Sequence, residues 1–336
     1  MGAQYQQLSL EDRCAIARLH AQGGSLRQIA AALDRNPSTI SREINRNITR
    51  QKGYQPAYAQ DQSKARRWKG SRLDRSPELR DLVLNHLKCR WSPEQIAGRL
   101  ERDTGAPVIS HETIYRFIYA QLTRTNDSTW RNYLPRSKTR RGYRGHKGGS
   151  PANFIKDRVS IHQRPQEVED RSTLGNWESD FILFSKSGQS VLALHDRNSR
   201  ILWATRPKNR TAAPTARALI ALLKPLPPAF RKTMTLDNGT EFSHHAKLHR
   251  INLKTYFCDP HSPWQKGSIE NAIGRLRRFL PRKTDLASLN DTDFNACIRN
   301  YNNTPRKCLG YKTPAEVFCQ QLLHFKCEST SRLSPG

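Results

Sequence analysis

The sequence predicts a multidomain chain, with an all-α region at the N-terminus followed by an α/β domain. Three observations support this division. A helical pattern with capping residues runs through residues 9–46 and recurs 67 residues later. A stretch without any acidic residue then extends from Ser128 to Lys156. Beyond it, short alternating or apolar runs bounded by turn residues are typical of β-strands.

The three predicted helices of residues 9–46 form a helix-turn-helix pattern. Ser9 and Ser25 are placed to cap the first two helices, and Asn36-Pro37 begins the third. The side chains predicted to face the core are Leu10, Ile16, Leu19, Ile29, Ala30, Leu33, Ile40 and Ile44. Hydroxyls and arginines on an exposed helix suit the major groove of DNA. The predicted DNA-binding residues of the third helix are Ser38, Thr39, Ser41, Arg42 and Arg46.

The same pattern returns in a second unit. The segment SPEQIAGRL (92–100) matches SLRQIAAAL (25–33), and HETIY (111–115) matches the start of the third helix after a seven-residue insertion. This later helix is more apolar, because it carries Tyr115, Phe117 and Tyr119. The second unit is therefore predicted to contact DNA, or to be a packing or dimerisation module of similar shape.

The charge of the chain indicates a polyanionic partner. Its 336 residues include 57 Lys and Arg against 29 Asp and Glu, a formal net charge of +28. Nucleic acid is the usual partner, because each neutralised phosphate releases a counterion. Ribosome-like packing and an anionic membrane surface are the alternatives. No apolar run approaches the roughly 18 residues of a membrane helix, so we expect no membrane association.

The cysteines indicate the compartment. Seven are scattered along the chain with no CxxC pair, so neither a zinc ribbon nor a disulfide framework is expected. An odd number of free thiols fits a reducing cytoplasm. The N-terminus lacks the profile of a signal peptide. We therefore expect a cytoplasmic protein.

The strand-like segments follow a recognisable order. Residues 177–184, 190–195 and 200–206 are predicted to form a three-strand meander, and 211–224 a helix. Strands at 233–236 and 254–258 follow, with a helix between them and another, containing Glu270, after them. This is the order of an RNase H-like domain of the integrase catalytic core type.

These patterns divide the chain into six segments. The all-α part comprises a first helix-turn-helix domain (1–50), a linker (51–75) and a second helix-turn-helix domain (76–127). A basic flexible linker (128–165) leads to the RNase H-like catalytic domain (166–320) and a C-terminal tail (321–336). Arg140 and Arg141 in the basic linker are predicted to contact DNA phosphates, unless the segment is only a solvated tether.

Three carboxylates lie at positions that converge in this fold. Asp180 lies in the first strand, Asp237 ends the fourth, and Glu270 opens the helix after the last strand. Clustered carboxylates repel one another unless cations lie among them. Hard oxygen ligands suit Mg²⁺ or Mn²⁺, and two such ions about 4 Å apart can support phosphoryl transfer. We therefore predict a catalytic site that holds two metal ions.

Each of these residues also has an ordinary structural explanation. Asp237 in Asp-Asn-Gly can form a turn, and the helix dipole alone favours Glu270 near a helix N-terminus. Glu178 lies on the same strand face as Asp180 and is the alternative ligand. Arg277, two helical turns after Glu270, is predicted to hold a DNA phosphate beside the site, or is an ordinary surface arginine.

At these residues the sequence resembles the IS-thirty family of bacterial insertion-sequence transposases, which have a DDE catalytic domain. The resemblance covers nearly the whole chain. It is carried by STISREI (38–44), SPEQIA (92–97), GNWESD (175–180), DNGTEF (237–242), DPHSPWQKGSIEN (259–271) and YNNTPRKCLGYKTPAEVF (301–318). Two residues depart from the family pattern: Ser179 stands where Gly is expected, and Ile269 where a polar Asn is expected.

The resemblance implies a DNA transposase. Asp180, Asp237 and Glu270 would be its catalytic and metal-binding acids, with Mg²⁺ as cofactor. It would bind the terminal inverted repeats, cut a strand to leave a 3′-OH, and transfer that end to target DNA. Since two ends must be brought together, we expect a homo-oligomer on double-stranded DNA, associated with the nucleoid and without a small-molecule substrate. The alternatives are a DNA-binding transcriptional regulator with an inactive RNase H-like domain, and a nuclease that cuts without joining.

Overall fold

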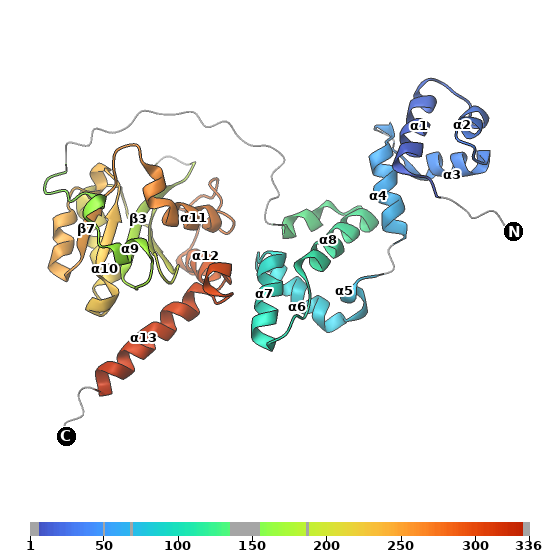
Figure 1. The fold of residues 1–336 in the computed structure, drawn as a ribbon. Coiled ribbons are helices and arrows are strands. Elements are labelled where there is room, and N and C mark those ends of the chain that lie inside the picture. The colour runs from blue at the N-terminus through green and yellow to red at the C-terminus, as the bar shows by residue number, and fades with distance from the viewer. Residues whose placement is uncertain (1–6, 50, 68–69, 135–154, 186–187, 332–336) are drawn as a thin grey trace. The chain divides into compact units, whose positions relative to one another are not determined.

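The computed structural model describes residues 7–49, 51–67, 70–134, 155–185 and 188–331 (Figure 1). Arg140 and Arg141 lie outside the described residues. Proximity of Cα atoms divides the chain into two compact units. The first comprises the described residues up to Lys88 together with 92–94 and 108–134. The second comprises 89–91, 95–107 and the described residues from 155 onward.

The first unit begins with the three predicted helices, α1 (Leu10–Ala21), α2 (Leu26–Ala32) and α3 (Pro37–Asn47). Ser9, Ser25 and Asn36 cap them as predicted, each accepting a hydrogen bond from a backbone amide of the first turn. The predicted core residues Ile16, Ile29, Ala30, Ile40 and Ile44 are buried. The prediction for Leu10 was wrong, since it is 48% exposed; Leu8, before the cap, is buried in its place.

A buried ionic network completes this helical core. Glu43 of α3 is fully buried and accepts hydrogen bonds from Arg13 Nε at 2.8 Å and from the Tyr54 hydroxyl at 3.3 Å. Arg46 also pairs with Glu43, although its side chain remains 47% exposed. These guanidinium partners lower the pKa of Glu43 against the opposing effect of burial. The network joins α1 and α3 to the residues that follow them.

The predicted linker over residues 51–75 was largely wrong. Strands β1 (Ile48–Thr49) and β2 (Gly53–Tyr54) form a short hairpin, and α4 (Pro56–Arg66) packs against α1. Tyr54 and Ala59 belong to the same apolar cluster as the core of the first three helices. Proline at the first helical position favours the start of α4. A further turn, α5 (Arg72–Arg75), precedes the second set of helices.

Three helices also occupy the predicted second unit of the helical region, α6 (Pro77–Lys88), α7 (Pro93–Thr104) and α8 (His111–Thr125). A 3-10 segment, η1 (Ser128–Tyr133), follows α8, and its Trp130 packs edge-on against Phe117 with ring centroids 5.9 Å apart. Residues 128–133 therefore belong to the first unit and not to the predicted basic linker.

The second unit contains a five-stranded mixed sheet in the order β5-β4-β3-β6-β7. Its strands are β3 (Asn176–Leu183), β4 (Ser190–Asp196), β5 (Leu202–Thr205), β6 (Thr233–Leu236) and β7 (Lys254–Phe257). The first three form the predicted antiparallel meander, and β6 and β7 run parallel to β3. The fold is RNase H-like, as predicted. Between β6 and β7, however, the chain forms the 3-10 segments η5 (Thr240–Phe242) and η6 (His245–Ile251) in place of a full α-helix.

Helices cover both faces of this sheet (Figure 1). On one face, α10 (Ala212–Leu223) packs against Trp177, Leu192 and Leu194. On the other, α11 (Gly267–Leu276) and α12 (Asp291–Asn302) pack against Ile182, Val191 and Ala193. The alternation of strand side chains thus places β3 residues of even number, including Asp180, on the α11 face.

The ends of this domain extend beyond the predicted limits. Ile155 lies in the apolar core, and the Phe257 amide donates to the Val159 carbonyl at 2.8 Å. The segments η3 (Ile161–Gln163) and α9 (Gln166–Glu169) follow. The predicted C-terminal tail was wrong for its first part, because α13 (Pro314–Ser331) continues through it and Phe325 packs on the core. No helix among the described residues is long and apolar enough to cross a membrane.

Candidate active site

The strand register brings Asp180 and Asp237 together. In the parallel pairing of β3 with β6, Glu178 lies opposite Thr235. Two residues further along each strand, Asp180 and Asp237 come level with one another, as the predicted convergence requires. Asp180 is still within β3, and Asp237 is the first residue after β6.

Each aspartate is oriented by its own backbone. Asp180 Oδ1 accepts a hydrogen bond from the Phe181 amide at 2.7 Å, and Asp237 Oδ1 accepts one from the Gly239 amide at 3.2 Å. A Cβ atom on Gly239 would lie 3.1 Å from Asp237 Oδ1 and 2.6 Å from the Glu241 carboxylate, so a larger residue there would require the Glu241 side chain to move. The second oxygen of each aspartate, Oδ2, accepts neither of these backbone amides and faces the cavity side chain of Lys266.

Both Oδ2 atoms face the same cation, the ammonium group of Lys266. Its Nζ lies 3.4 Å from Asp180 Oδ2 and 3.0 Å from Asp237 Oδ2, and donates to the Ser179 carbonyl at 3.3 Å. The side chain comes from η7 (Pro263–Lys266) and is 5% exposed. Burial alone would lower the pKa of Lys266, but attraction to the two aspartates outweighs it and the pKa is raised. Burial raises the pKa of Asp180, with repulsion from Asp237 acting the same way and Lys266 opposing.

Glu270 shares a cavity with the two aspartates. The cavity has a volume of about 540 Å³, and Asp180, Asp237, Lys266 and Glu270 are among its lining residues. Glu270 lies in the first turn of α11 and is exposed, and its carboxylate makes no hydrogen bond or ion pair with any described residue. Across the described part of the chain, no three His, Cys, Asp or Glu side chains lie close enough to hold a metal. The carboxylate of Glu270 is therefore on the cavity wall, apart from the aspartate pair.

Glu178, the alternative ligand, is committed elsewhere. It is fully buried, its Oε1 pairs with Arg197, and its Oε2 accepts the Ile269 amide at 2.8 Å. A carboxylate at this place ties the N-terminal turn of α11 to β3 and suits the helix dipole. Glu178 therefore positions the helix that carries Glu270, and its oxygens face away from free solvent.

The two departures from the family pattern are both accommodated. The Ile269 side chain is fully buried in the apolar cluster between the sheet and α11, while its amide is bound by Glu178. Ser179 is buried on the opposite face of β3, and its hydroxyl donates to the Ala193 carbonyl at 3.1 Å. Neither side chain lines the acidic cavity.

The predicted DNA-binding residues lie in two places. On α3, Ser38, Arg42 and Arg46 are exposed, and Thr39 and Ser41 are half-buried. Arg277, at the end of α11, donates to the Leu183 carbonyl at 2.6 Å and places its guanidinium 4.6 Å from the centre of the Phe184 ring. Burial and nearby Arg282 lower the pKa of Arg277. Its guanidinium is thus partly used in holding α11 to β3.

Comparisons with known proteins agree with this architecture. A helix-turn-helix domain family matches residues 4–47. The chain is 37% identical to the transposase for insertion sequence element IS1086 of Cupriavidus metallidurans, over 95% of this chain and 96% of that protein. It is also 37% identical to the transposase InsI for IS30A of Escherichia coli, over 87% and 78% of the two chains. With the transposase for IS4351 of Bacteroides fragilis the identity is 34%, over 92% and 94%. The chain belongs to the IS30 family of insertion-sequence transposases.

Proposed function

We propose that this DNA transposase cuts and joins DNA strands at the acidic cavity, where Asp180, Asp237 and Glu270 hold two Mg²⁺ ions. The observation that carries the proposal is the convergence of two aspartate oxygens on one cation, the Lys266 ammonium. A position that already holds a positive charge between two carboxylates suits a divalent cation. Carboxylate oxygens are the ligands that Mg²⁺ and Mn²⁺ prefer, so Mn²⁺ is the expected substitute.

When bound, such ions would activate the attacking oxygen and stabilise the charge that develops on the leaving oxygen. The protein's own part is to hold the carboxylates in position. Backbone amides fix one oxygen of each aspartate, and Glu178 anchors the helix that carries Glu270. At the same cavity, Arg210 pairs with Glu241 at 2.8 Å, so its charge is placed near an approaching DNA strand.

The proposed reaction has two displacements at phosphorus. In the first, a water oxygen bonds to the phosphorus at the element end, the bond to the 3′ oxygen breaks, and that oxygen leaves as a 3′-OH after taking a proton. In the second, the oxygen of this 3′-OH gives up its proton and bonds to a target phosphorus, while the 3′ oxygen of the target strand leaves and takes up a proton. Neither displacement requires a covalent bond between protein and DNA.

DNA recognition is assigned to the other predicted residues. Side chains on α3 would read the element ends in the major groove, and arginines elsewhere would contact phosphates. The proposed residues are Ser38, Thr39, Ser41, Arg42, Arg46, Arg140, Arg141 and Arg277. Because cleavage and joining act on two ends at once, the active form is proposed to be a homo-oligomer assembled on end DNA and target DNA.

A cleavage assay tests this function. Purified protein is incubated with labelled element-end DNA and Mg²⁺, using wild type, Glu270→Gln and the control Glu167→Gln, which removes an exposed carboxylate of the same domain outside the cavity. Wild type and control should cut the DNA and join the products to other DNA, and Glu270→Gln should do neither. Equal cleavage by Glu270→Gln would contradict the assignment.

A further inference from the structure

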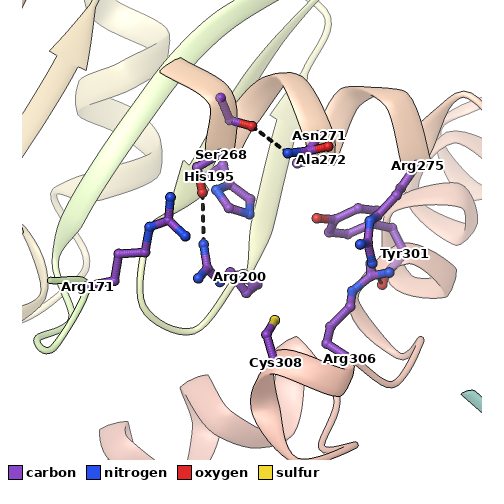
Figure 2. A pocket seen from close by; sticks show the side chains of 11 residues that line it. Arg171, His195, Arg200, Ser268, Asn271, Ala272, Arg275, Tyr301, Arg306 and Cys308 are labelled. Atoms are coloured by element: carbon purple, nitrogen blue, oxygen red, sulfur yellow. Dashed lines mark hydrogen bonds between the residues drawn. The ribbon is translucent and has the colours of Figure 1, made fainter. Parts of the chain in front are cut away.

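A second pocket lies on a neighbouring stripe of α11, and its lining is basic (Figure 2). Its volume is about 330 Å³. Gly267, Ser268, Asn271 and Arg275 of α11 line it, whereas Lys266 and Glu270 of the same region line the acidic cavity. The two cavities therefore share the first turns of one helix.

Four guanidinium groups line this arginine pocket: Arg171, Arg200, Arg275 and Arg306. No carboxylate is among the lining residues. The buried carboxylate of Glu178 attracts Arg171 and partly offsets its repulsion by Arg200 and Arg197, but Glu178 does not line the pocket, and its oxygens are bound by Arg197 and by the Ile269 amide. The described lining of the pocket is thus a concentration of positive charge with no carboxylate in it, whereas the acidic cavity is lined by carboxylates and by Lys266.

Buried nitrogen atoms in the pocket also lack hydrogen-bond partners among the described residues. Arg200 Nε, Arg306 Nε and His195 Nδ1 are buried and make no hydrogen bond. His195 is 2% exposed and Arg306 is 4% exposed, and Figure 2 shows both side chains at the pocket. Buried polar groups are almost always paired in folded proteins, so such a set indicates a site that an external acceptor completes.

The same side chains are nevertheless held in fixed positions. Arg200 Nη1 donates to Ser268 Oγ at 2.9 Å. Arg306 donates to the Tyr301 carbonyl at 3.0 Å and stacks 4.5 Å from the centre of the Tyr301 ring. The backbones of Arg171 and Arg200 also have positive φ angles, of 55° and 64°, which residues other than glycine rarely adopt. The fold therefore maintains this arrangement against a conformational cost.

Mutual repulsion among these groups is visible in their protonation. Partial burial lowers the pKa of Arg171, whose side chain remains largely exposed, and the neighbouring Arg200 and Arg197 lower it further. Burial lowers the pKa of Arg306, with Arg275 acting in the same direction. The pKa of His195 is held well below its usual range by burial and then by the surrounding arginines. An anion in the pocket would relieve all three effects.

We propose that the arginine pocket binds a phosphate group of the DNA backbone next to the strand that occupies the acidic cavity. This inference rests on the proposed function, since it is DNA entering the acidic cavity that brings a phosphate within reach. Arginine suits the role because its planar fork can donate two hydrogen bonds to phosphate oxygens. The volume of the arginine pocket is about ten times the ~30 Å³ that one water molecule occupies in the liquid. The pocket therefore has room for a phosphate group.

DNA is favoured over a free phosphate ion as the source. Arg171, Asn271 and Arg275 are exposed at the pocket rim, so a polymer can pass over the opening. The deeper nitrogen atoms belong to His195 and Arg306, and a phosphate can reach them without the sugar or base following it. In addition, α11 carries both the proposed catalytic Glu270 and the rim residues, so one bound strand can reach both cavities.

The test compares the full chain with Arg171→Gln/Arg275→Gln, which removes two exposed rim charges and leaves the buried arginines intact. The control is Arg217→Gln/Arg299→Gln, which removes two exposed arginines that line neither cavity. Binding of a fluorescent mixed-sequence duplex is followed by anisotropy in EDTA across a salt series. The pocket variant should bind roughly tenfold more weakly. Its slope of log affinity against log salt should fall by about one unit, while the control retains the wild-type slope.

A methylphosphonate scan and inorganic phosphate distinguish the sources. One neutral methylphosphonate should weaken binding to wild type but have no further effect on the pocket variant. Equal losses in pocket variant and control would overturn the proposal, because net charge alone would then explain them. Binding of inorganic phosphate to wild type, together with unchanged DNA binding by the pocket variant, would assign the pocket to a free anion and also overturn it. EDTA prevents cleavage, so failure of this proposal is distinguishable from failure of the catalytic assignment.

Discussion

The acidic cavity and the arginine pocket carry opposite charges on neighbouring stripes of one helix, and they handle that charge differently. Between Asp180 and Asp237 the protein supplies its own cation, Lys266. The described residues that line the arginine pocket include four arginines and no carboxylate. Lys266 thus reduces the repulsion between Asp180 and Asp237 before any ligand binds. The repulsion among the four arginines would be reduced only when an anion binds. A metal ion that binds between the two aspartates must therefore displace Lys266. An anion that binds in the arginine pocket would displace no side chain of the protein.

The largest effect is expected for Asp237→Asn. This change keeps the size of the side chain and removes one of the two charges that face Lys266. Cleavage of element-end DNA in Mg²⁺ should fall by at least on the order of a hundredfold, the scale seen when one transition-state contact is lost. DNA binding in EDTA should be unchanged. Cleavage at the wild-type rate would mean that the acidic cavity is not the reacting site.

The second-largest effect is expected for Glu178→Gln, which should lower the stability of the folded protein. It breaks a buried pair and leaves Arg197 with only the half-exposed Glu169, at 3.3 Å, as a carboxylate partner. Breaking a buried pair completely costs about 3–5 kcal/mol in comparable cases, and Glu169 should reduce this cost. The first turn of α11 also loses the charge bound to the Ile269 amide. Thermal unfolding should occur at a lower temperature, and hydrogen exchange should rise in α11. A variant that is stable but has lost metal binding would instead identify Glu178 as a ligand.

Lys266→Met tests whether the Lys266 ammonium stabilises the aspartate pair and competes with a metal ion for it. Without the ammonium, Asp180 and Asp237 repel one another, so the metal-free protein should be less stable. A divalent ion no longer competes with Lys266, so Mn²⁺ should bind more tightly, by roughly tenfold or about 1.4 kcal/mol. Weaker Mn²⁺ binding in this variant would show that Lys266 supports the metal site and does not compete for it.

Buried His195 should make the stability of the second unit depend on pH. Its pKa in the folded protein lies well below the usual 6.5, chiefly because of burial. The unfolded chain therefore binds more protons as the pH falls below 6.5, and the second unit should lose stability there, by up to about 1.4 kcal/mol per pH unit. Stability from this group should be complete above that pH. His195→Gln should flatten the dependence in urea unfolding; an unchanged slope would mean that His195 does not cause it.

Much of this site could be predicted from sequence because its signals are local. Capping residues mark the starts of α1, α2 and α3, and Asp237 and Glu270 lie at the ends of periodic segments that show where each element begins or ends. Lys266 was missed, since nothing in Pro-Trp-Gln-Lys distinguishes a buried lysine from an exposed one. Helix α4 and the end of α13 were missed because their few apolar residues, such as Ala59 and Phe325, gain meaning only from the surfaces they cover.

The arginine pocket could not be predicted from the sequence, for a different reason. Arg171 and Arg200 lie in loops around β3 and β4, Arg275 is on α11, and Arg306 follows α12. In a chain with 57 Lys and Arg, none of them stands out individually. Only the sheet order and the packing of α11 and α12 on one face bring them to a single cavity.

The most direct test of the central claim is a Mn²⁺ titration followed by electron paramagnetic resonance, because it measures the metal site without DNA or turnover. Wild type, Asp180→Asn, Asp237→Asn and the control Glu167→Gln are compared at equal concentration. We expect saturable Mn²⁺ binding in wild type and control, and its loss in both aspartate variants. Equal binding in all four proteins would contradict the claim that the acidic cavity holds the metal ions.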